Sequence, residues 1–211
     1  MYHLTEEIKF PSIKNATKEG IIAIGGNLSV KRLLLAYRTG IFPWYEEGTP
    51  IIWWSPDPRM VLFPNKLKIS KSMQQIMRNN TFQVTYNEAF KDVITHCAHV
   101  KRKDQKGTWI TKDMITAYCK LHEAGHATSV EVWKESELIG GLYGVDLGHI
   151  FCGESMFSII NNASKVAFIH LVQRLYSENY KLIDCQVYTK HLASLGAEEI
   201  PRADFLKLLS K

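Results

Sequence analysis

Long hydrophobic runs are missing from the sequence, and their absence excludes a protein built on membrane-spanning helices. Apolar stretches, such as those within residues 32–37 and 166–171, are far shorter than the roughly 20 residues that a transmembrane helix needs. Residues 1–15 contain two acidic side chains and no apolar segment, so neither a secretory signal nor a lipidation site is expected. Together these absences predict a cytoplasmic protein without a membrane partner.

Cysteine is scarce, and neither sign of charge is in strong excess. Four cysteines, Cys97, Cys119, Cys152 and Cys185, are scattered without a C-x-x-C pair, which favours reduced, buried thiols over a disulfide framework. The net charge of +5 permits an anionic partner such as a nucleic acid, but many enzymes carry as much. With 45% hydrophobic residues and no internal repeat, the chain is expected to fold around an ordinary core.

The chain changes character near residue 65. Residues 1–65 are rich in proline, glycine and tryptophan, and the three prolines from residue 50 to residue 58 forbid a regular helix there. One short helix is expected in this part, capped by Ser29 and ended by Gly40. We therefore predict a small N-terminal lobe, residues 1–65, and a main domain, residues 66–211.

The main domain alternates between helical and strand periodicity. Helices are expected after the capping residues Ser70, Asn87 and Thr111, and later from about residue 162, near residue 191 and from residue 203. Strands at 128–134, 138–145 and 149–157 predict an antiparallel meander, followed by strands at 181–187 and 198–200. This order predicts an α+β fold, which is compatible, by analogy, with the GNAT acyltransferase fold.

A zinc-protease signature, H-E-x-x-H, is matched by residues 122–126. Its chemistry needs both histidines one turn apart on a continuous helix, with the glutamate as general base. Gly125 predicts the end of the helix that Thr111 begins, so we expect His126 to lie beyond the helix and no metal to be bound. The pair His96 and His99 is expected at another, solvated helix end.

Polar residues stand among apolar ones in the predicted strand at 181–187. Strand alternation places Asp184 and Gln186 on one face, where polar groups are costly unless they are paired or used. A structural hydrogen bond and a functional role are equally compatible with this spacing. Cys185 and Cys152 are possible nucleophiles, but no histidine or aspartate is visibly set to activate them, so buried thiols are favoured.

Glu154 is an acid inside the apolar run at 151–158. If no bulge intervenes, it shares a face with Cys152 and Met156. A buried acid needs a partner. A cationic group of a substrate would serve, and so would a local salt bridge with Lys165 or Arg174.

Several short motifs occur in an order that resembles a known family. They are GGNLS at 25–29, GIFPW at 40–44, WWSPDPR at 53–59, GTWIT at 107–111, FCGESMFS at 151–158, NASK at 162–165, LIDCQ at 182–186 and ASLGA at 193–197. Each motif alone is weak, but this many in register over about residues 20–205 are hard to obtain by chance. The sequence thus resembles the leucyl/phenylalanyl-tRNA–protein transferases.

The resemblance implies a small N-terminal domain on a GNAT-like domain that uses neither acetyl-coenzyme A nor another cofactor. The donor would be tRNA charged with Leu or Phe, and less so Met, and the acceptor a protein that begins with Arg or Lys. The product would carry a destabilising N-terminal residue that marks it for proteolysis. We expect a monomer. Longer family members continue past the match to residues 205–207, so the resemblance covers the core site but no contact that such a tail makes.

Aromatic residues matched to the family are Trp44 and Trp109, which would stack on the terminal adenosine of the tRNA. Tyr118 is expected in the same cleft or, because its helical spacing is that of core residues, in the core. Met156 and Leu142 are candidates for the pocket of the donated side chain, since unbranched methionine tolerates both aliphatic and aromatic partners. All of these side chains are also compatible with ordinary core positions.

The chemistry would depend on orientation, because an aminoacyl ester is already activated towards amines. We expect Gln186 to accept a hydrogen bond from the attacking amine and Asp184 to fix and polarise that amide. Glu154 would help to hold the cationic acceptor residue. Phosphate contacts are expected from basic residues, although a solvated charged face explains each of them equally well. The candidates are Lys66, Lys68, Lys71, Lys101, Arg102 and Lys103.

Two other functions compete with this one. A GNAT-type N-acyltransferase that uses acyl-coenzyme A would want a glycine-rich loop before its central helix, but residues 159–165 contain no glycine. A non-catalytic RNA-binding protein would explain the aromatic and basic residues, but it would leave Asp184, Gln186 and Glu154 unused.

Overall fold

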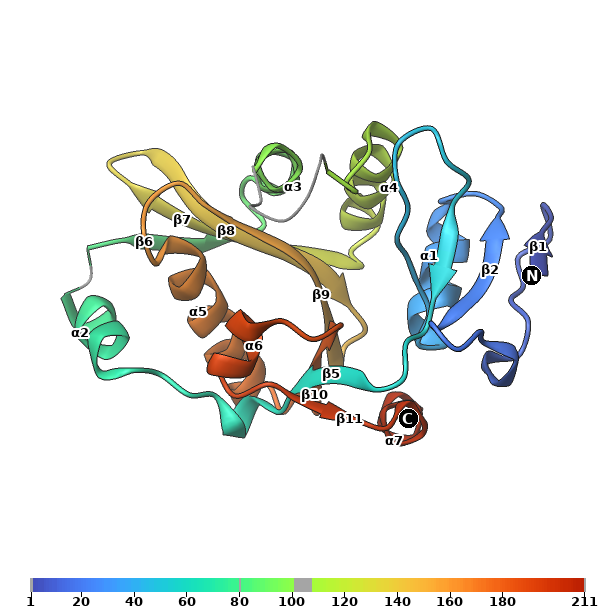
Figure 1. Cartoon of the computed structure of the whole chain (residues 1–211). Helices are drawn as coiled ribbons and strands as arrows, with labels where there is room; N and C mark the ends of the chain where they lie inside the picture. Colours follow the sequence, from blue (N-terminus) through green and yellow to red (C-terminus); the bar gives the residue numbers. More distant parts are fainter. Residues whose placement is uncertain (1, 80, 101–107, 211) are drawn as a thin grey trace.

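The computed structural model describes residues 2–79, 81–100 and 108–210 of the chain. Its first part forms a small sheet with the strand order β1-β2-β4-β3 and one helix (Figure 1). The elements are β1 (Tyr2–Leu4), β2 (Ile21–Gly25), α1 (Val30–Arg38), β3 (Phe42–Pro43) and β4 (Ile52–Trp54). As expected, Ser29 caps α1, because its side chain accepts a hydrogen bond from the backbone N–H of Arg32.

A seven-stranded sheet with the order β11-β5-β10-β9-β8-β7-β6 organises the rest of the described chain. Its strands are β5 (Arg59–Leu62), β6 (Gln83–Tyr86), β7 (Ala127–Lys134), β8 (Glu137–Asp146), β9 (Ile150–Ser158), β10 (Leu182–Gln186) and β11 (Glu198–Ile200). The meander β7-β8-β9 is antiparallel, as predicted, whereas β9 and β10 pair in parallel. The predicted α+β fold is confirmed.

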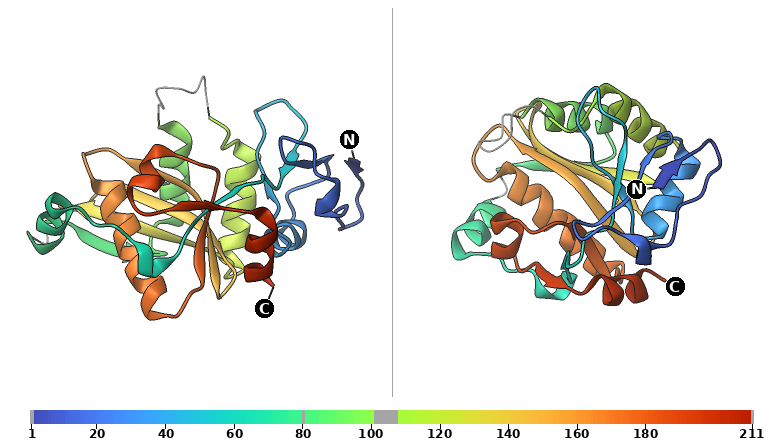
Figure 2. Two further views of the ribbon diagram at one scale, coloured as in Figure 1. Left: turned by 60° about the horizontal axis from the view of Figure 1, so that its bottom comes forward. Right: turned by 45° about the vertical axis from the view of Figure 1, so that its right-hand side comes forward.

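Helices cover both faces of the large sheet, as Figures 1 and 2 show. They are α2 (Lys71–Asn79), α3 (Phe90–His99), α4 (Lys112–Glu123), α5 (Ala163–Ser177), α6 (Lys190–Ser194) and α7 (Arg202–Leu209). Helices α3 and α4 pack on one face and α5 packs on the other. Two hydrophobic clusters result, one on each side of the sheet. None of the described helices combines the length and apolar composition that a transmembrane segment requires.

The predicted helix boundaries hold at Thr111 and Gly125 but not at Asn87. Thr111 accepts a hydrogen bond from the N–H of Met114, and α4 ends before Gly125, whose φ is +78°. Asn87 was expected to cap the next helix and does not, because it has a φ of +62° and its side chain accepts from the N–H of Ser129 on β7. Helix α3 instead begins at Phe90, without a side-chain cap.

Strand β5 falls within the first 65 residues, yet it pairs with β10 and β11 in the large sheet. The two sheets therefore divide the chain between β4 and β5, a few residues before the boundary expected at residue 65. This matters for the site, because β5 lies beside β10 and carries Arg59.

Strands β9 and β10 pair only along part of their length. The parallel register runs from Leu182 opposite Ile150 to Asp184 opposite Cys152 and ends there, while β9 continues along β8 to Ser158. Beyond that point β9 and β10 are no longer joined by a ladder. The opening between them is where polar side chains of both strands meet.

A β-bulge re-aims the side chains of β9 at the same level. Tyr143 and Gly144 of β8 oppose Ser155 and Gly153, so that Glu154 is the extra residue between them. A Cβ at Gly144 would lie 2.3 Å from the carbonyl oxygen of Cys152, so only glycine allows this close approach. The bulge shifts the alternation by one residue, so the condition under which Cys152, Glu154 and Met156 were expected to share a face is not met.

Candidate active site

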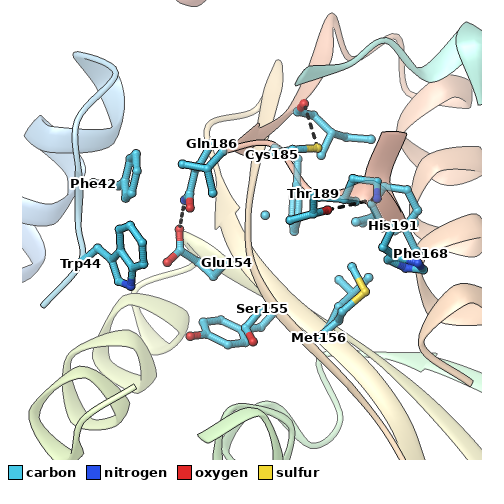
Figure 3. Close-up of a pocket in the computed structure, with 18 of the residues that line it drawn as sticks. Phe42, Trp44, Glu154, Ser155, Met156, Phe168, Cys185, Gln186, Thr189 and His191 are labelled. Atoms are coloured by element: carbon cyan, nitrogen blue, oxygen red, sulfur yellow. Dashed lines mark hydrogen bonds between the residues drawn. The ribbon is translucent and has the colours of Figure 1, made fainter. Parts of the chain in front are cut away.

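A cavity of about 420 Å³ lies between the N-terminal part and the large sheet. Its walls come from β3 and the residue after it, from the segment before α4, from strands β8 to β10, and from α5 and α6 (Figure 3). The lining is mostly apolar. Its members include Phe42, Trp44, Trp109, Leu142, Phe151, Met156, Phe168, Leu171 and Ile183. The cavity can therefore take an apolar side chain of some size.

One polar bridge crosses the wall where β9 and β10 part. Nε2 of Gln186 donates to Oε1 of Glu154 at 2.7 Å, and Figure 3 shows both side chains beside Trp44 and Phe42. Within the described chain, Oε1 of Gln186 has no hydrogen-bond partner. An amide held by its nitrogen and open at its oxygen can accept a hydrogen bond from a ligand in the cavity.

Two buried tyrosines lie behind Glu154. Tyr37 of α1 donates to Oε1 of Glu154 at 2.7 Å, Tyr118 of α4 donates to Oε2 at 3.1 Å, and the two hydroxyls contact each other. Loss of solvation raises the pKa of Glu154 to about 7, although the hydrogen bonds from Tyr37, Tyr118 and Gln186 oppose this. Burial likewise raises the pKa of both tyrosines well above the usual value, so they remain donors.

No cation balances Glu154 among the described residues. Of the two local salt bridges considered, Lys165 instead contacts Asn162 and Arg174 pairs with Glu178. Glu154 is thus a carboxyl group that takes or releases a proton near neutral pH and is surrounded by neutral donors. Its charge is available to a cationic ligand.

Asp184 faces away from the cavity and is paired. Its Oδ1 and Oδ2 accept from Nε and Nη2 of Arg59 at 2.7 and 2.6 Å, and each side chain is 1% exposed. Oδ1 also accepts from the backbone N–H of Gln186 at 3.0 Å. Asp184 therefore contacts the backbone of Gln186 rather than its side-chain amide.

The expectation that Asp184 and Gln186 share a strand face is wrong, and the reason is a second irregularity. The register between β10 and β5 shifts between these two residues, and Gln186 has a φ of +65°. This turn of the backbone directs Gln186 towards Glu154 while Asp184 points to Arg59. Simple alternation cannot describe a strand that ends in a left-handed residue.

Four of the five expected donor-binding residues line the cavity. They are Trp44, Trp109, Leu142 and Met156. Trp44 is 38% exposed, and Nε1 of Trp54 fixes its loop by donating to the carbonyl of Trp44 at 2.7 Å. Tyr118 is the exception. It is completely buried and reaches the cavity only through Glu154, so the core alternative holds for it.

The basic candidates for phosphate contacts differ in their surroundings. Lys66, Lys68 and Lys71 are all exposed, but Lys66 pairs with Glu198 and lies over the ring of Phe63. The remaining three candidates, Lys101, Arg102 and Lys103, lie outside the described residues.

The zinc-like motif is split, as expected. Helix α4 ends at Glu123, so His126 lies beyond it, and Nδ1 of His122 is 2.7 Å from the carbonyl oxygen of Ala127. Across residues 2–79, 81–100 and 108–210, no group of three or more metal-binding side chains is assembled. The thiols of Cys152 and Cys185 have a strongly raised pKa, because burial disfavours the thiolate, so neither is activated as a nucleophile.

Sequence analysis missed two residues of the site, Tyr37 and Arg59. Tyr37 lies on the apolar face of a short helix, which is the pattern of an ordinary core residue. Arg59 ends the WWSPDPR motif, but its ion pair with Asp184 joins residues 125 positions apart. A charged residue after three prolines and before an apolar strand was the available signal.

An apolar cavity bordered by an amide held in place and a carboxyl group with a raised pKa has the features of a binding or active site. The family model described as "Leucyl/phenylalanyl-tRNA protein transferase" matches residues 61–210, and that of the N-terminal domain of the same family matches residues 26–57. The chain therefore belongs to the leucyl/phenylalanyl-tRNA–protein transferase family, whose members are aminoacyltransferases.

Similar proteins cover the whole chain. A leucyl/phenylalanyl-tRNA–protein transferase of Flavobacterium johnsoniae is 58% identical over 209 residues, which is 99% of each chain. One of Flavobacterium psychrophilum is 57% identical over 211 residues and covers both chains completely. Among solved structures, a GCN5-related N-acetyltransferase from Kribbella flavida shares 9% identity, with a TM-score of 0.39, over 76% of this chain and 56% of that chain. Membership in the family rests on the sequence relatives.

Proposed function

We propose that this protein transfers Leu or Phe, and less readily Met, from aminoacyl-tRNA to the α-amino group of proteins that begin with Arg or Lys. The proposal places this reaction in the cytoplasm, with the protein acting as a monomer, and makes the product a substrate for degradation. The observation that carries it is the apolar cavity beside the bridge between Gln186 and Glu154. A donor side chain fits the first, and a cationic acceptor suits the second.

Donor binding would use the aromatic and aliphatic walls. Trp44 and Trp109 offer ring faces for the terminal adenine, and stacking of a base on such a ring contributes about 1–3 kcal/mol. Leu142 and Met156 would contact the Leu, Phe or Met side chain deeper in the cavity. The tRNA body would be held mainly by charge, with Lys68 and Lys71 as exposed candidates.

Acceptor binding would use the unbalanced carboxyl group. Glu154 has only neutral hydrogen-bond donors, so an Arg or Lys at the acceptor N-terminus would supply the missing positive charge. Because the pKa of Glu154 is about 7, the carboxylate form that attracts a cation increases as pH rises through neutrality. An acceptor that begins with Ala would gain nothing from this group.

The reaction forms a C–N bond between the acceptor α-amine and the aminoacyl carbonyl and breaks the ester C–O bond. A neutral amine attacks, and the proton that it loses ends on the ribose oxygen that leaves with the tRNA. Oε1 of Gln186 would accept a hydrogen bond from the attacking amine and thereby stabilise the positive charge that develops on nitrogen. Asp184 would contribute through the backbone of Gln186, to which it is bonded.

The acyl-coenzyme A alternative has less support. An anion site at the start of α5 would need free backbone N–H groups, but the N–H of Ser164 already donates to Oγ of Ser158 at 3.2 Å. A binding protein without catalysis would have no use for an amide held in place beside a carboxyl group. The reaction with aminoacyl-tRNA uses both.

The test is transfer of labelled Leu or Phe from purified charged tRNA to two peptides that differ only in beginning with Arg or Ala. Label on the Arg peptide alone, unaffected by a chelator, is the expected result. If neither peptide is labelled while charged tRNA still binds, the protein binds RNA without this activity. Labelling from acyl-coenzyme A instead would establish the other alternative.

A further inference from the structure

Arg59 is a buried cation that contacts three separate parts of the chain. It is 1% exposed and forms two hydrogen bonds to Asp184 on β10. Its third nitrogen, Nη1, donates to the carbonyl oxygen of Gly40 at 3.2 Å. Its guanidinium also lies over the rings of Phe42 and Phe205, 4.9 and 4.7 Å from their centroids. All three guanidinium nitrogens therefore donate hydrogen bonds, and two aromatic rings lie against the cation.

One set of Arg59 contacts reaches Gln186 through Asp184. Asp184 Oδ1 shares its lone pairs between Arg59 and the N–H of Gln186. Gln186 follows with a φ of +65°, a conformation that a non-glycine residue keeps only when its surroundings enforce it. The bidentate contact with Arg59 fixes both oxygens of Asp184, so the carboxylate cannot rotate away from the backbone N–H of Gln186.

A second set of Arg59 contacts, with Gly40 and Phe42, reaches the cavity wall. Phe42 lines the cavity, and Trp44 follows two residues later. Gly40 and Phe42 belong to the N-terminal part, whereas Asp184 belongs to the large sheet. Arg59 thus joins the strand that carries Gln186 to the segment that carries the aromatic wall.

We propose that Arg59 is a positioning residue for this reaction. It holds Asp184, and through Asp184 the backbone of Gln186, in register with the cavity wall formed by Phe42 and Trp44. The inference rests on the function proposed above. Arg59 touches neither donor nor acceptor, and its effect on the transfer rate passes through Gln186.

The primary test is the variant Arg59→Lys, which keeps the positive charge but loses the bidentate contact with Asp184. Single-turnover transfer of Phe to an Arg peptide is expected to fall about 10-fold or more, since one charged hydrogen bond of the pair is lost. The apparent Kd for charged tRNA is expected to change less than about twofold, within the range of surface substitutions. A fall in tRNA affinity equal to the fall in rate would overturn the proposal.

A matched control is Arg32→Lys. Arg32 is another fully buried arginine, and it donates to the carbonyl oxygens of Thr5 and Glu7 in the N-terminal part, away from the cavity. Both Arg32→Lys and Arg59→Lys are expected to lower the melting temperature. Arg32→Lys is expected to leave the transfer rate unchanged at a temperature where the protein is folded. An equal loss of rate in both variants would mean that Arg59 contributes only stability.

A double-mutant cycle separates positioning from general damage. In a Gln186→Ala background, Arg59→Lys is expected to change the single-turnover rate by less than about twofold, because the group it positions is gone. The same loss factor in both backgrounds would overturn the proposal. If Arg59→Lys does not fold, Asp184→Asn in the two backgrounds tests the same link from its other end. Transfer by the unchanged protein in these assays reports separately on the proposed function.

Discussion

Two acidic residues on neighbouring strands flank Gln186, and their surroundings are opposite. Asp184 is buried against Arg59, with both of its oxygens bonded to the same guanidinium. Glu154 has two tyrosines and an amide as partners, and none of the described cations. The fold gives Asp184 a permanent counter-charge and leaves Glu154 without one, so that Glu154 can pair with a cationic ligand. Burial alone therefore does not indicate the role of an acid; the charge of its partners does.

The largest effect is expected at the residue that the two acids share. Gln186→Ala should lower the single-turnover rate about 100-fold or more, which is the usual cost of removing one group aimed at charge in the transition state. Charged tRNA should still bind. Rapid-quench measurement of label transfer to an Arg peptide checks this. A rate close to that of the unchanged protein would remove Gln186 from the catalytic residues.

The paired acid comes next. Asp184→Asn should lower the rate about 10- to 100-fold, because hydrogen bonds to a charged group contribute roughly 1.5–3 kcal/mol. The KM for the Arg peptide should hardly change, since Asp184 points away from the cavity. If the loss appeared in KM alone, Asp184 would behave as an acceptor-binding group and the contrast with Glu154 would disappear.

A residue of the proposed donor site provides a comparison for the two acids. Trp109→Ala should raise the apparent Kd for charged tRNA about 10-fold, in line with the loss of one stacked base. The KM for the acceptor peptide should stay within about twofold of its original value, the size of effect typical of a side chain outside the binding contact. Filter binding and steady-state kinetics give the two constants. Equal changes in both would argue against a separate adenosine site.

The unbalanced acid should affect the acceptor. Glu154→Gln should raise the KM for an Arg peptide about 10-fold, because a charge-assisted contact is lost, and leave tRNA affinity unchanged. In the unchanged protein this KM should fall as pH rises through about 7, where Glu154 becomes ionised. The variant should lose that dependence. A pH dependence that survives the substitution would belong to another group.

The smallest effect concerns stability. The pKa of Glu154 is raised to about 7 in the folded state, so the folded protein binds this proton more tightly than the unfolded chain does. Its contribution is therefore favourable at low pH and is lost as pH rises from about 4.5 to about 7. Glu154→Gln should stabilise the protein relative to the unchanged one more at pH 8 than at pH 5, and the gain in the free energy of unfolding should differ between the two pH values by at most about 3 kcal/mol. Calorimetry at both values measures this, and an equal shift at both would contradict the raised pKa.

Local signals in the sequence were enough for much of the fold. The cap at Thr111, the end at Gly125 and the three strands of the meander all depend on neighbouring residues, and each was predicted. Strands β5 and β6, of four residues each, were not predicted, and the place of β5 depends on β10, which lies far along the chain. Non-local pairing leaves no periodic pattern in so short a segment.

The site was predicted in its residues more than in its geometry. The cavity brings together Glu154, Gln186, Trp44 and Trp109, which sequence analysis named, and their roles in transfer stay predictions. The two strand irregularities that orient Glu154 and Gln186 were not predicted, because a bulge is defined by the partner strand. Tyr37 and Arg59 escaped notice for the related reason that their partners lie on distant elements.

The parting of β9 and β10 sets stability against activity in this protein. If β10 were redesigned to continue its ladder along β9, it would gain hydrogen bonds and close the opening that Glu154 and Gln186 now occupy. Such a variant would be expected to melt at a higher temperature and to lose the cavity. Attempts to make the protein more heat-resistant should therefore leave the unpaired ends of β9 and β10 unchanged and introduce stabilising substitutions elsewhere in the sheet.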